Sequence, residues 1–164
     1  IGEFDESIPS IFGQDYGYSI DPSTLIEVAI DKKNKRIYVR EHFYLPKLTT
    51  TEVYRMNIQF ARNGLIIGDS AEPRLIEEIK TKGCNIQAVK KGKDSVITGI
   101  KMIQDYDLIV DPDSTNIIKE LNNYVWSNKT AGLPVDKFNH TLDAIRYAVF
   151  YSLGNPNRGV YHIR

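Results

Sequence analysis

Hydrophobic and polar positions over the first third of the chain predict three β-strands. The runs 11–20, 24–30 and 36–45 are rich in β-branched and aromatic residues, and the third alternates most regularly between apolar and polar positions. Residues 21–23 and 33–35 supply the short turns between these runs. Consecutive strands joined by short turns predict an antiparallel three-strand meander.

After residue 48 the apolar spacing changes to that of helices separated by short strands. Pro73 is expected in the first turn of the second helix, Gly64 and Gly83 are expected to end the first two helices, and Asp113 or Ser114 is expected to cap the fourth. The expected helices are 49–62, 74–82, 95–104, 114–124 and 139–153, and the expected strands are 65–67, 85–89 and 107–110. Alternating strands and helices favour parallel strands with right-handed crossovers. We therefore expect an α/β fold in which a mixed sheet, the meander plus parallel strands, is flanked by helices.

The length of 164 residues suits one domain, which we expect over residues 11–154. Residues 1–10 are expected to be an N-terminal extension or an expression remnant, and residues 155–164 a polar tail. No apolar run approaches the roughly 20 residues needed to cross a bilayer, so no membrane partner is expected. The single Cys84 cannot form an internal disulfide, which favours a reducing cytoplasm, and a structural zinc site is not expected.

The formal net charge is zero, but charge is distributed unevenly along the chain. Residues 1–31 contain acids and no Lys or Arg, whereas residues 80–93 contain lysines and no acid. An acidic region suits a metal site and a basic region suits a phosphate backbone. Two solvated surfaces of opposite sign remain the alternative.

Asp15 and Asp69 are the first two candidates for catalysis. Strand alternation places Asp15 on one face with Gly13 and Gly17, and glycine in a strand permits close approach of a ligand or of another backbone. Asp69 follows a short apolar strand, and ligands gather at the carboxyl ends of parallel strands. The alternatives are a turn contact for Asp15 and a helix cap for Asp69.

Asp143 and His140 share one face of the last expected helix, because they are three residues apart. Asp143 has a structural alternative, which is pairing with Arg146 or Tyr147, and His140 has the alternative of a surface or capping role. His42 and His162 belong to no recognisable constellation.

Oxygen ligands with few nitrogens suit Mg²⁺ or Mn²⁺ better than zinc. Two such ions can activate a water and stabilise the leaving oxygen in phosphodiester hydrolysis. In that arrangement Asp15 would bridge both ions, Asp69 and Asp143 would each complete one, and His140 would tune the second. No convincing Ser/His/Asp or Cys/His set competes with this interpretation.

Lys90, Lys91 and Lys93 surround a glycine just before a predicted helix. Lysines beside a helix N-terminus can hold phosphates, so we expect these residues to contact the DNA backbone, with a solvated loop as the alternative. The segment is not a Walker A loop, because Gln87 and Asp94 replace residues which that motif needs.

Four segments together resemble the nuclease domain of the tailed-bacteriophage terminase large subunit. They are Gly13-Gln-Asp-Tyr-Gly17, Gly68-Asp-Ser70, Lys91-Gly-Lys-Asp-Ser-Val-Ile-Thr-Gly-Ile100 and Asn139-His-Thr-Leu-Asp-Ala-Ile-Arg-Tyr147. The resemblance covers roughly residues 11–154, and the last segment is the most specific.

The resemblance implies a ribonuclease H-like fold and metal-dependent cutting of concatemeric double-stranded DNA during viral packaging. It implies that Asp15, Asp69 and Asp143 are the catalytic acids and that His140 matches the family's helix histidine. It also implies a terminase ATPase domain, a portal and a small terminase subunit as partners, in the cytoplasm of a bacterial host that carries a phage or prophage. Without a Walker A segment, this chain is expected to be the nuclease half and not to hydrolyse ATP.

Three alternatives remain open. Asp15-Tyr-Gly-Tyr-Ser19 also resembles the first phosphate loop of actin-type and sugar-kinase ATPases, but those proteins need a second loop and a duplicated domain. Another nuclease or resolvase of the ribonuclease H-like fold is the second. An inactive interaction module with this fold is the third, and the presence of all three acids argues against it.

Overall fold

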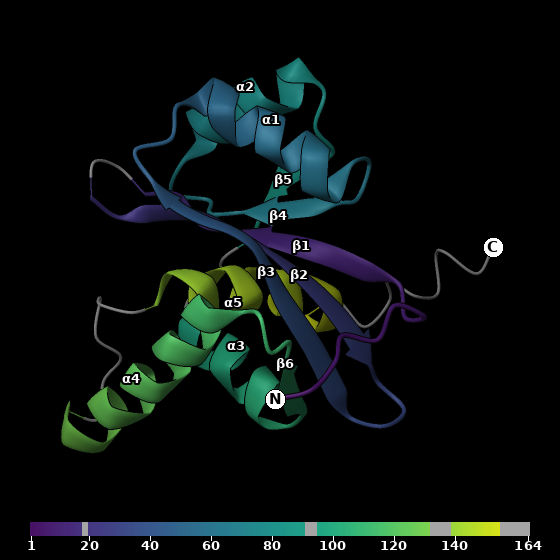
Figure 1. Cartoon of the computed structure of the whole chain (residues 1–164), viewed down its shortest axis with the longest axis vertical. Coiled ribbons are helices and arrows are strands. Elements are labelled where there is room, and N and C mark those ends of the chain that lie inside the picture. The colour runs from purple at the N-terminus through teal and green to yellow at the C-terminus, as the bar shows by residue number, and fades with distance from the viewer. Residues whose placement is uncertain (18–19, 91–94, 132–138, 155–164) are drawn as a thin grey trace.

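A mixed sheet forms the centre of the protein (Figure 1), for which the computed structural model describes residues 1–17, 20–90, 95–131 and 139–154. The strands are β1 (Ser10–Gln14), β2 (Pro22–Asp31), β3 (Arg36–Pro46), β4 (Ile66–Gly68), β5 (Ile86–Ala88) and β6 (Asp107–Val110), in the order β5-β4-β1-β2-β3-β6. The pairs β1–β2 and β2–β3 are antiparallel. Strands β4 and β5 extend the sheet in parallel beyond β1, and β6 pairs in parallel with β3. The predicted meander with added parallel strands is therefore confirmed.

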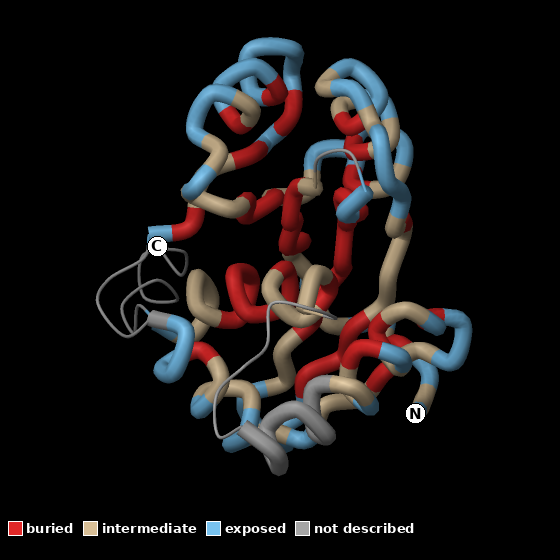
Figure 2. The backbone as a smooth tube through the Cα atoms, turned by 90° about the vertical axis from the view of Figure 1, so that its left-hand side faces the viewer, coloured by how far each residue is buried: buried red, intermediate tan, exposed pale blue. Residues whose placement is uncertain are grey.

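Helices cover both faces of this sheet (Figure 1). They are α1 (Thr50–Ala61), α2 (Pro73–Lys82), α3 (Ser95–Gln104), α4 (Thr115–Ala131) and α5 (His140–Leu153). Helices α1 and α2 pack on one face, around Phe12, Leu25 and Phe43. Helices α3, α4 and α5 pack on the other face, around Ile26 and Val39. Since both faces are covered, the central strands are buried (Figure 2). Among the described helices, none combines the length and apolar character needed to cross a membrane.

Two predicted boundaries are wrong by several residues. The run 11–20 was expected to be one strand, but β1 ends at Gln14. Gly17 already lies against the backbone just before the next strand, since a Cβ there would be 2.0 Å from the carbonyl oxygen of Asp21. At the other end of the chain, the fourth helix was expected to stop at Tyr124 but continues to Ala131. Each added residue contributes a backbone hydrogen bond, so a helix can continue beyond the last residue of its apolar stripe.

The first helix also ends differently from the prediction. Gly64 was expected to stop it, but Arg62 is the C-cap residue, with a φ of 52° and an N–H that donates to the Ile58 carbonyl. Gly64 instead makes room for a neighbour, because a Cβ there would lie 2.6 Å from the Phe12 ring. The helix begins with a capping box in which Thr49 and Glu52 exchange hydrogen bonds.

The N-terminal residues pack on the sheet. The Gly2 N–H donates to the Val110 carbonyl over 2.9 Å, beside the edge strand β6. Phe4 is buried against Ala29 and Tyr38, and the Arg40 guanidinium lies 4.2 Å from its ring centroid. The extension predicted for residues 1–10 thus contributes a small apolar cluster to this domain.

Candidate active site

Asp15 and Asp69 lie at neighbouring strand ends. Asp15 follows β1 and Asp69 follows β4, and these strands are parallel, with Gln14 opposite Gly68. The Asp69 N–H donates to the Gln14 carbonyl over 3.2 Å, which fixes the two ends side by side. The placement of Asp69 at the carboxyl end of a parallel strand agrees with the sequence prediction, whereas Asp15 was predicted inside its strand and instead follows the end of β1.

Gln14 is anchored on the other face of the sheet. Its side-chain amide and that of Asn57 on α1 exchange two hydrogen bonds, of 2.7 and 2.9 Å. Both side chains are fully buried. The residue before Asp15 is therefore held by a neutral amide pair that no local sequence pattern indicates.

Gly13 brings α5 against β1. From the sequence, the glycines beside Asp15 could make room for a ligand or for another backbone, and the structure shows backbone at both. A Cβ at Gly13 would lie 1.8 Å from the Ala144 carbonyl oxygen, and one at Gly17 would lie 2.0 Å from that of Asp21. Both glycines make room for protein backbone, the other option that glycine allows. Because α5 crosses β1 at Ala144, the preceding Asp143 is carried toward Asp15.

His140 contacts Asp15 directly. Its Nδ1 lies 3.4 Å from Asp15 Oδ2, and its Nε2 lies 3.8 Å from Asp21 Oδ1. The hydrogen bond with Asp15 raises the pKa of His140, burial opposes this, and the charges of Asp15, Glu120 and Asp21 add to it. Asp21 was not predicted as a site residue, since a turn aspartate carries no special signal.

Electrostatics connect the three predicted acids. Burial raises the pKa of Asp15 to about 6; the His140 hydrogen bond opposes this, and the charges of Asp143 and Asp69 add to it. The pKa of Tyr147 on α5 is also raised, first by burial and then by Asp15, Asp143 and Asp69. Asp15 is thus affected by the other two acids and Tyr147 by all three, so the three carboxylates act on one region.

Asp69 shapes the turn before α2 without capping that helix. Its Oδ1 accepts the Ala71 N–H over 2.9 Å, whereas the N-cap residue of α2 is Glu72. The helix-cap alternative for Asp69 is therefore wrong, although its carboxylate does hold the local turn.

Asp143 pairs with Arg146, as its structural alternative proposed. Arg146 Nη2 donates to Asp143 Oδ1 over 3.1 Å, from a side chain that is mostly buried between α3 and α5. Gly99 on α3 makes room for this side chain, because a Cβ there would lie 2.5 Å from Arg146 Cγ. An ion pair that orients a carboxylate is compatible with a ligand role. The pattern of α5 did not reveal that α3 would confine Arg146.

The donor set fits a hard divalent cation. As the side chains stand, no three His, Cys, Asp or Glu residues in the described part of the chain converge closely enough to enclose an ion. Asp15 is nevertheless buried, at 7% exposed, beside two further carboxylates whose charges disfavour its ionisation. A cation with oxygen ligands would relieve that repulsion, as Mg²⁺ and Mn²⁺ do in carboxylate sites.

The predicted DNA-contacting lysines fall mostly outside the described residues. Lys90 is exposed after β5, while Lys91 and Lys93 lie in the segment 91–94, which the structure does not describe. Helix α3 begins directly after that segment and packs on α5 through Gly99 and Arg146. The segment therefore leads into a helix that supports the helix carrying Asp143.

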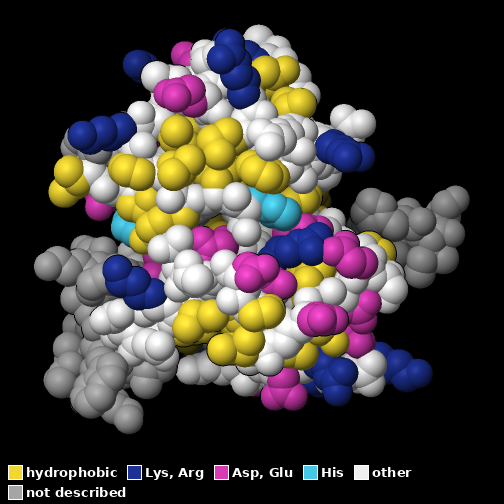
Figure 3. Space-filling view, viewed as in Figure 1, with side chains coloured by type: hydrophobic (Ala, Val, Ile, Leu, Met, Phe, Trp, Pro, Cys, Tyr) yellow, Lys and Arg dark blue, Asp and Glu magenta, His cyan; other side chains and the backbone are white. Residues whose placement is uncertain are grey.

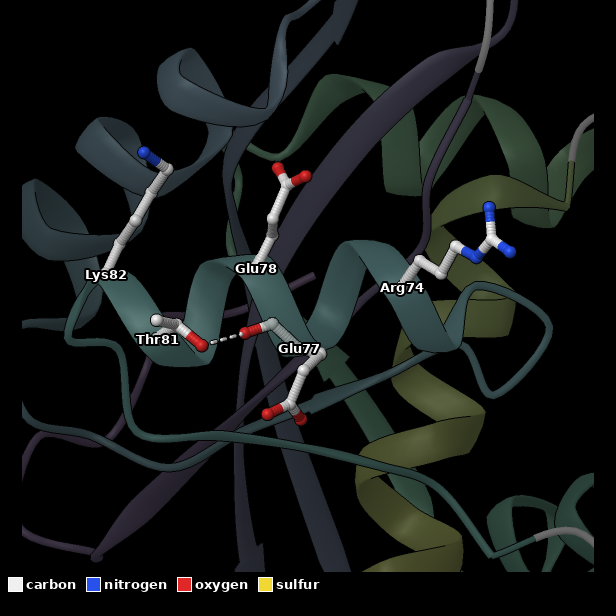
Figure 4. Close-up of a pocket in the computed structure, with 5 residues that line it drawn as sticks. All are labelled: Arg74, Glu77, Glu78, Thr81 and Lys82. Atoms are coloured by element: carbon white, nitrogen blue, oxygen red, sulfur yellow. Dashed lines mark hydrogen bonds between the residues drawn. The ribbon is translucent and has the colours of Figure 1, made fainter.

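The surface of the molecule shows where charged side chains gather. On the face shown in Figure 3, acidic and histidine side chains gather at mid-height, between the upper and lower parts of the molecule. A depression elsewhere is lined by Arg74, Glu77, Glu78, Thr81 and Lys82 (Figure 4). All of these residues are exposed and come from α2 alone, so this depression lacks side chains converging from different elements.

Comparison with known proteins gives consistent matches. The model of the terminase RNase H-like domain family matches residues 15–150. The large terminase subunit of Bacillus phage SPP1 is 38% identical over 148 residues, which cover 83% of this chain and 34% of that protein. The PBSX phage terminase large subunit of Bacillus subtilis strain 168 is 30% identical over 145 residues, covering 84% of this chain and 33% of that protein. The chain thus spans about a third of the length of these relatives.

A solved structure matches almost the whole chain. The nuclease domain of the large terminase from bacteriophage SPP1, crystallised with bound Mn, superposes with a TM-score of 0.80 at 30% identity. The match covers 93% of this chain and 94% of that one. The ribonuclease H-like fold predicted from the sequence is therefore confirmed.

Proposed function

The chain belongs to the family of terminase RNase H-like domains, and from that premise we propose that it is a metal-dependent endonuclease for double-stranded DNA. The substrate would be concatemeric viral DNA, cut at its phosphodiester bonds during packaging. The observation that carries the proposal is that the charges of Asp69 and Asp143 both raise the pKa of Asp15, and that all three acids raise the pKa of Tyr147. The relative crystallised with Mn supports the same chemistry.

We propose that Asp15, Asp69, Asp143 and His140 are the metal ligands. Two Mg²⁺ or Mn²⁺ ions bound there would activate a water and stabilise the leaving oxygen. Asp15, whose pKa is raised by the charges of both other acids, is the candidate bridging ligand. Arg146 orients the Asp143 carboxylate through their 3.1 Å contact, and the Ala71 N–H orients that of Asp69. His140 contacts Asp15 and restrains its carboxylate.

We propose that Lys90, Lys91 and Lys93 contact the phosphates of the DNA backbone. Their charges lie in sequence before the N-terminus of α3, where backbone N–H groups favour anions. Longer relatives are whole terminase large subunits, so we also propose an ATPase domain, a portal and a small terminase subunit as partners. The proposed setting is the cytoplasm of a bacterial host.

Plasmid cleavage with Mn²⁺ and without ATP tests the proposal. The protein should nick or linearise supercoiled DNA, and Asp15→Asn, Asp69→Asn and Asp143→Asn should each lower the rate by roughly a thousandfold or more, the scale of a lost catalytic group. The control is Thr49→Ala, which removes the α1 cap away from the acids and should cut normally. Undiminished cutting by any aspartate variant would remove that acid from the mechanism. A folded wild type that binds no Mn²⁺ and never cuts would favour an inactive module instead.

Replacing Lys90, Lys91 and Lys93 together by Ala should weaken DNA binding and reduce its salt dependence. Each phosphate that the variant no longer neutralises should make the slope of log K against log salt shallower by about 0.9. Binding measured by fluorescence anisotropy over a salt series reports this slope, and Arg74→Ala with Lys80→Ala and Lys82→Ala on α2 is a control that removes equal charge. An unchanged slope in the loop variant would exclude these lysines from the interface.

A further inference from the structure

Glu120 on α4 caps a helix other than its own. Its side chain is almost completely buried, at 1% exposed. Its Oε1 accepts three hydrogen bonds from the first turn of α5: from Thr141 N over 2.8 Å, from Thr141 Oγ1 over 2.7 Å and from Leu142 N over 3.2 Å. The first N–H groups of a helix have no partner within it, and they favour a negative charge. The N-cap residue of α5, Asn139, makes no side-chain capping bond, so Glu120 takes over that role.

The turn that Glu120 holds carries two of the proposed metal ligands. Thr141 and Leu142 lie between His140 and Asp143, so the hydrogen bonds from Glu120 fix the backbone between those side chains. The Asp143 N–H closes the same turn by donating to the Asn139 carbonyl over 2.7 Å. Any rotation or shift of this turn would move both side chains relative to Asp15.

Glu120 is itself tied to the sheet through a second carboxylate. Glu41 on β3 accepts the N–H groups of Asn116 and Ile117 at the start of α4, over 2.7 and 3.1 Å. In return, the Glu41 N–H donates to Ser114 Oγ over 2.9 Å. These hydrogen bonds fix the start of α4 to β3 and the start of α5 to α4. This chain of contacts gives α5 a defined position relative to the strand ends.

A buried carboxylate is a costly way to end a helix, since a neutral cap on α5 itself would satisfy the same N–H groups. Burial accordingly raises the pKa of Glu120, against the hydrogen bonds from Thr141 and Leu142. Its charge also acts on His140 and on Tyr44, whose ring lies edge-on to His140 at 6.3 Å. The carboxylate therefore faces the active-site end of α5 while contacting its backbone.

We propose that Glu120 is a positioning residue, which sets the first turn of α5 so that His140 and Asp143 face Asp15 in a geometry that binds metal. The proposal rests on the assignment of these residues as metal ligands. Groups that orient a metal ligand typically change affinity or activity by roughly 10–100-fold when removed. Loss of Glu120 should therefore weaken metal binding itself and slow cutting as a result.

The test compares Glu120→Ala with Glu120→Gln and with Thr49→Ala. Mn²⁺ binding by isothermal titration calorimetry should weaken about tenfold or more in Glu120→Ala. Glu120→Gln retains an accepting oxygen for the three donors and should bind Mn²⁺ nearly as the wild type does. Thr49→Ala loses a helix cap on α1, so it should melt at a lower temperature while its Mn²⁺ affinity stays unchanged.

Thr141→Val covers the case in which Glu120→Ala does not fold, because it removes one of the three donors and preserves side-chain shape. It should weaken Mn²⁺ binding by a few-fold, with Thr141→Ser close to wild type. The inference fails if folded Glu120→Ala binds Mn²⁺ with the same affinity as Thr49→Ala, because Glu120 is then a structural cap only. If Glu120→Ala does not fold, the same outcome for Thr141→Val refutes the inference. A wild type that binds no Mn²⁺ would instead refute the assignment of the metal ligands.

Discussion

Glu27 and Asp15 are two carboxylates buried to the same extent, at 8% and 7% exposed, on opposite faces of one sheet. Glu27 accepts hydrogen bonds from Ser10 and Arg40 and contacts His42 Nε2 over 2.8 Å. Burial raises its pKa, but these partners outweigh burial and bring the value to about 2. Asp15 has His140 as a partner but faces two further acids, and its pKa is about 6.

This difference shows that burial alone does not identify a functional acid. An acid whose charge is stabilised by hydrogen-bond donors and cations of the protein needs no added cation, and its ionised form stabilises the fold. An acid whose neighbours repel its charge is destabilised in the ionised form, and a bound cation can offset that repulsion. Three predictions test this contrast, in order of decreasing effect.

Glu27→Gln should produce the largest change in stability. The folded-state pKa of Glu27 lies below its ordinary value of 4.5, so its ionised form stabilises the fold above pH 4.5. That stability is lost as pH falls from about 4.5 to about 2. We expect Glu27→Gln to lower the free energy of unfolding by about 3 kcal/mol at pH 7, with a smaller difference at pH 3. Urea denaturation at both pH values measures this difference. A loss of unfolding free energy below about 1 kcal/mol at pH 7 would contradict the conclusion that protein donors stabilise the ionised form of Glu27.

Asp15→Asn should change stability in the opposite direction. The folded-state pKa of Asp15 lies above its ordinary value of 3.8, so the folded protein binds more protons than the unfolded chain between pH 4 and 6. Stability therefore falls as pH rises through that window, and the full cost remains above it. In EDTA at pH 7.5, Asp15→Asn should be about 2 kcal/mol more stable than the wild type, with no gain at pH 3. A variant less stable than wild type at pH 7.5 would mean that Asp15 is already matched within the protein.

Added Mn²⁺ should stabilise the wild type and the Glu27 variant but not the Asp15 variant, and this is the smallest of the three effects. A ligand present at ten times its dissociation constant stabilises the folded state by about 1.4 kcal/mol. The wild type and Glu27→Gln should both show this gain in a thermal melt, whereas Asp15→Asn should show little of it. Equal gains in all three proteins would place the ion away from Asp15.

Local patterns predicted most of the fold. Helix α3 and strand β6 have the predicted bounds, and β3 extends the predicted run by one residue, because apolar periodicity and turn residues decide such elements locally. Apart from the longer α4, the main errors concerned glycines. Gly13, Gly17 and Gly64 each make room for an element distant in sequence or across a turn, and a single sequence does not show what occupies that space.

The candidate site was predictable only in part for the same reason. Asp15, Asp69, Asp143 and His140 follow recognisable local patterns, at strand ends or on one helix face. Their supporting residues do not. Glu120 acts on α5 from the preceding helix, and Arg146 is confined by Gly99 on α3, so both roles depend on how the helices pack.

The amide pair between Gln14 and Asn57 has a consequence for how the domain responds to ions. Neither amide titrates, so we expect their mutual hydrogen bonds of 2.7 and 2.9 Å to persist whether Asp15 carries a proton, a charge or a metal. The pair therefore ties the end of β1 to α1 through groups whose own charge does not change when ions bind at the acids. Ion binding can then change the charge at the strand ends while the contact that aligns β1 with α1 is retained.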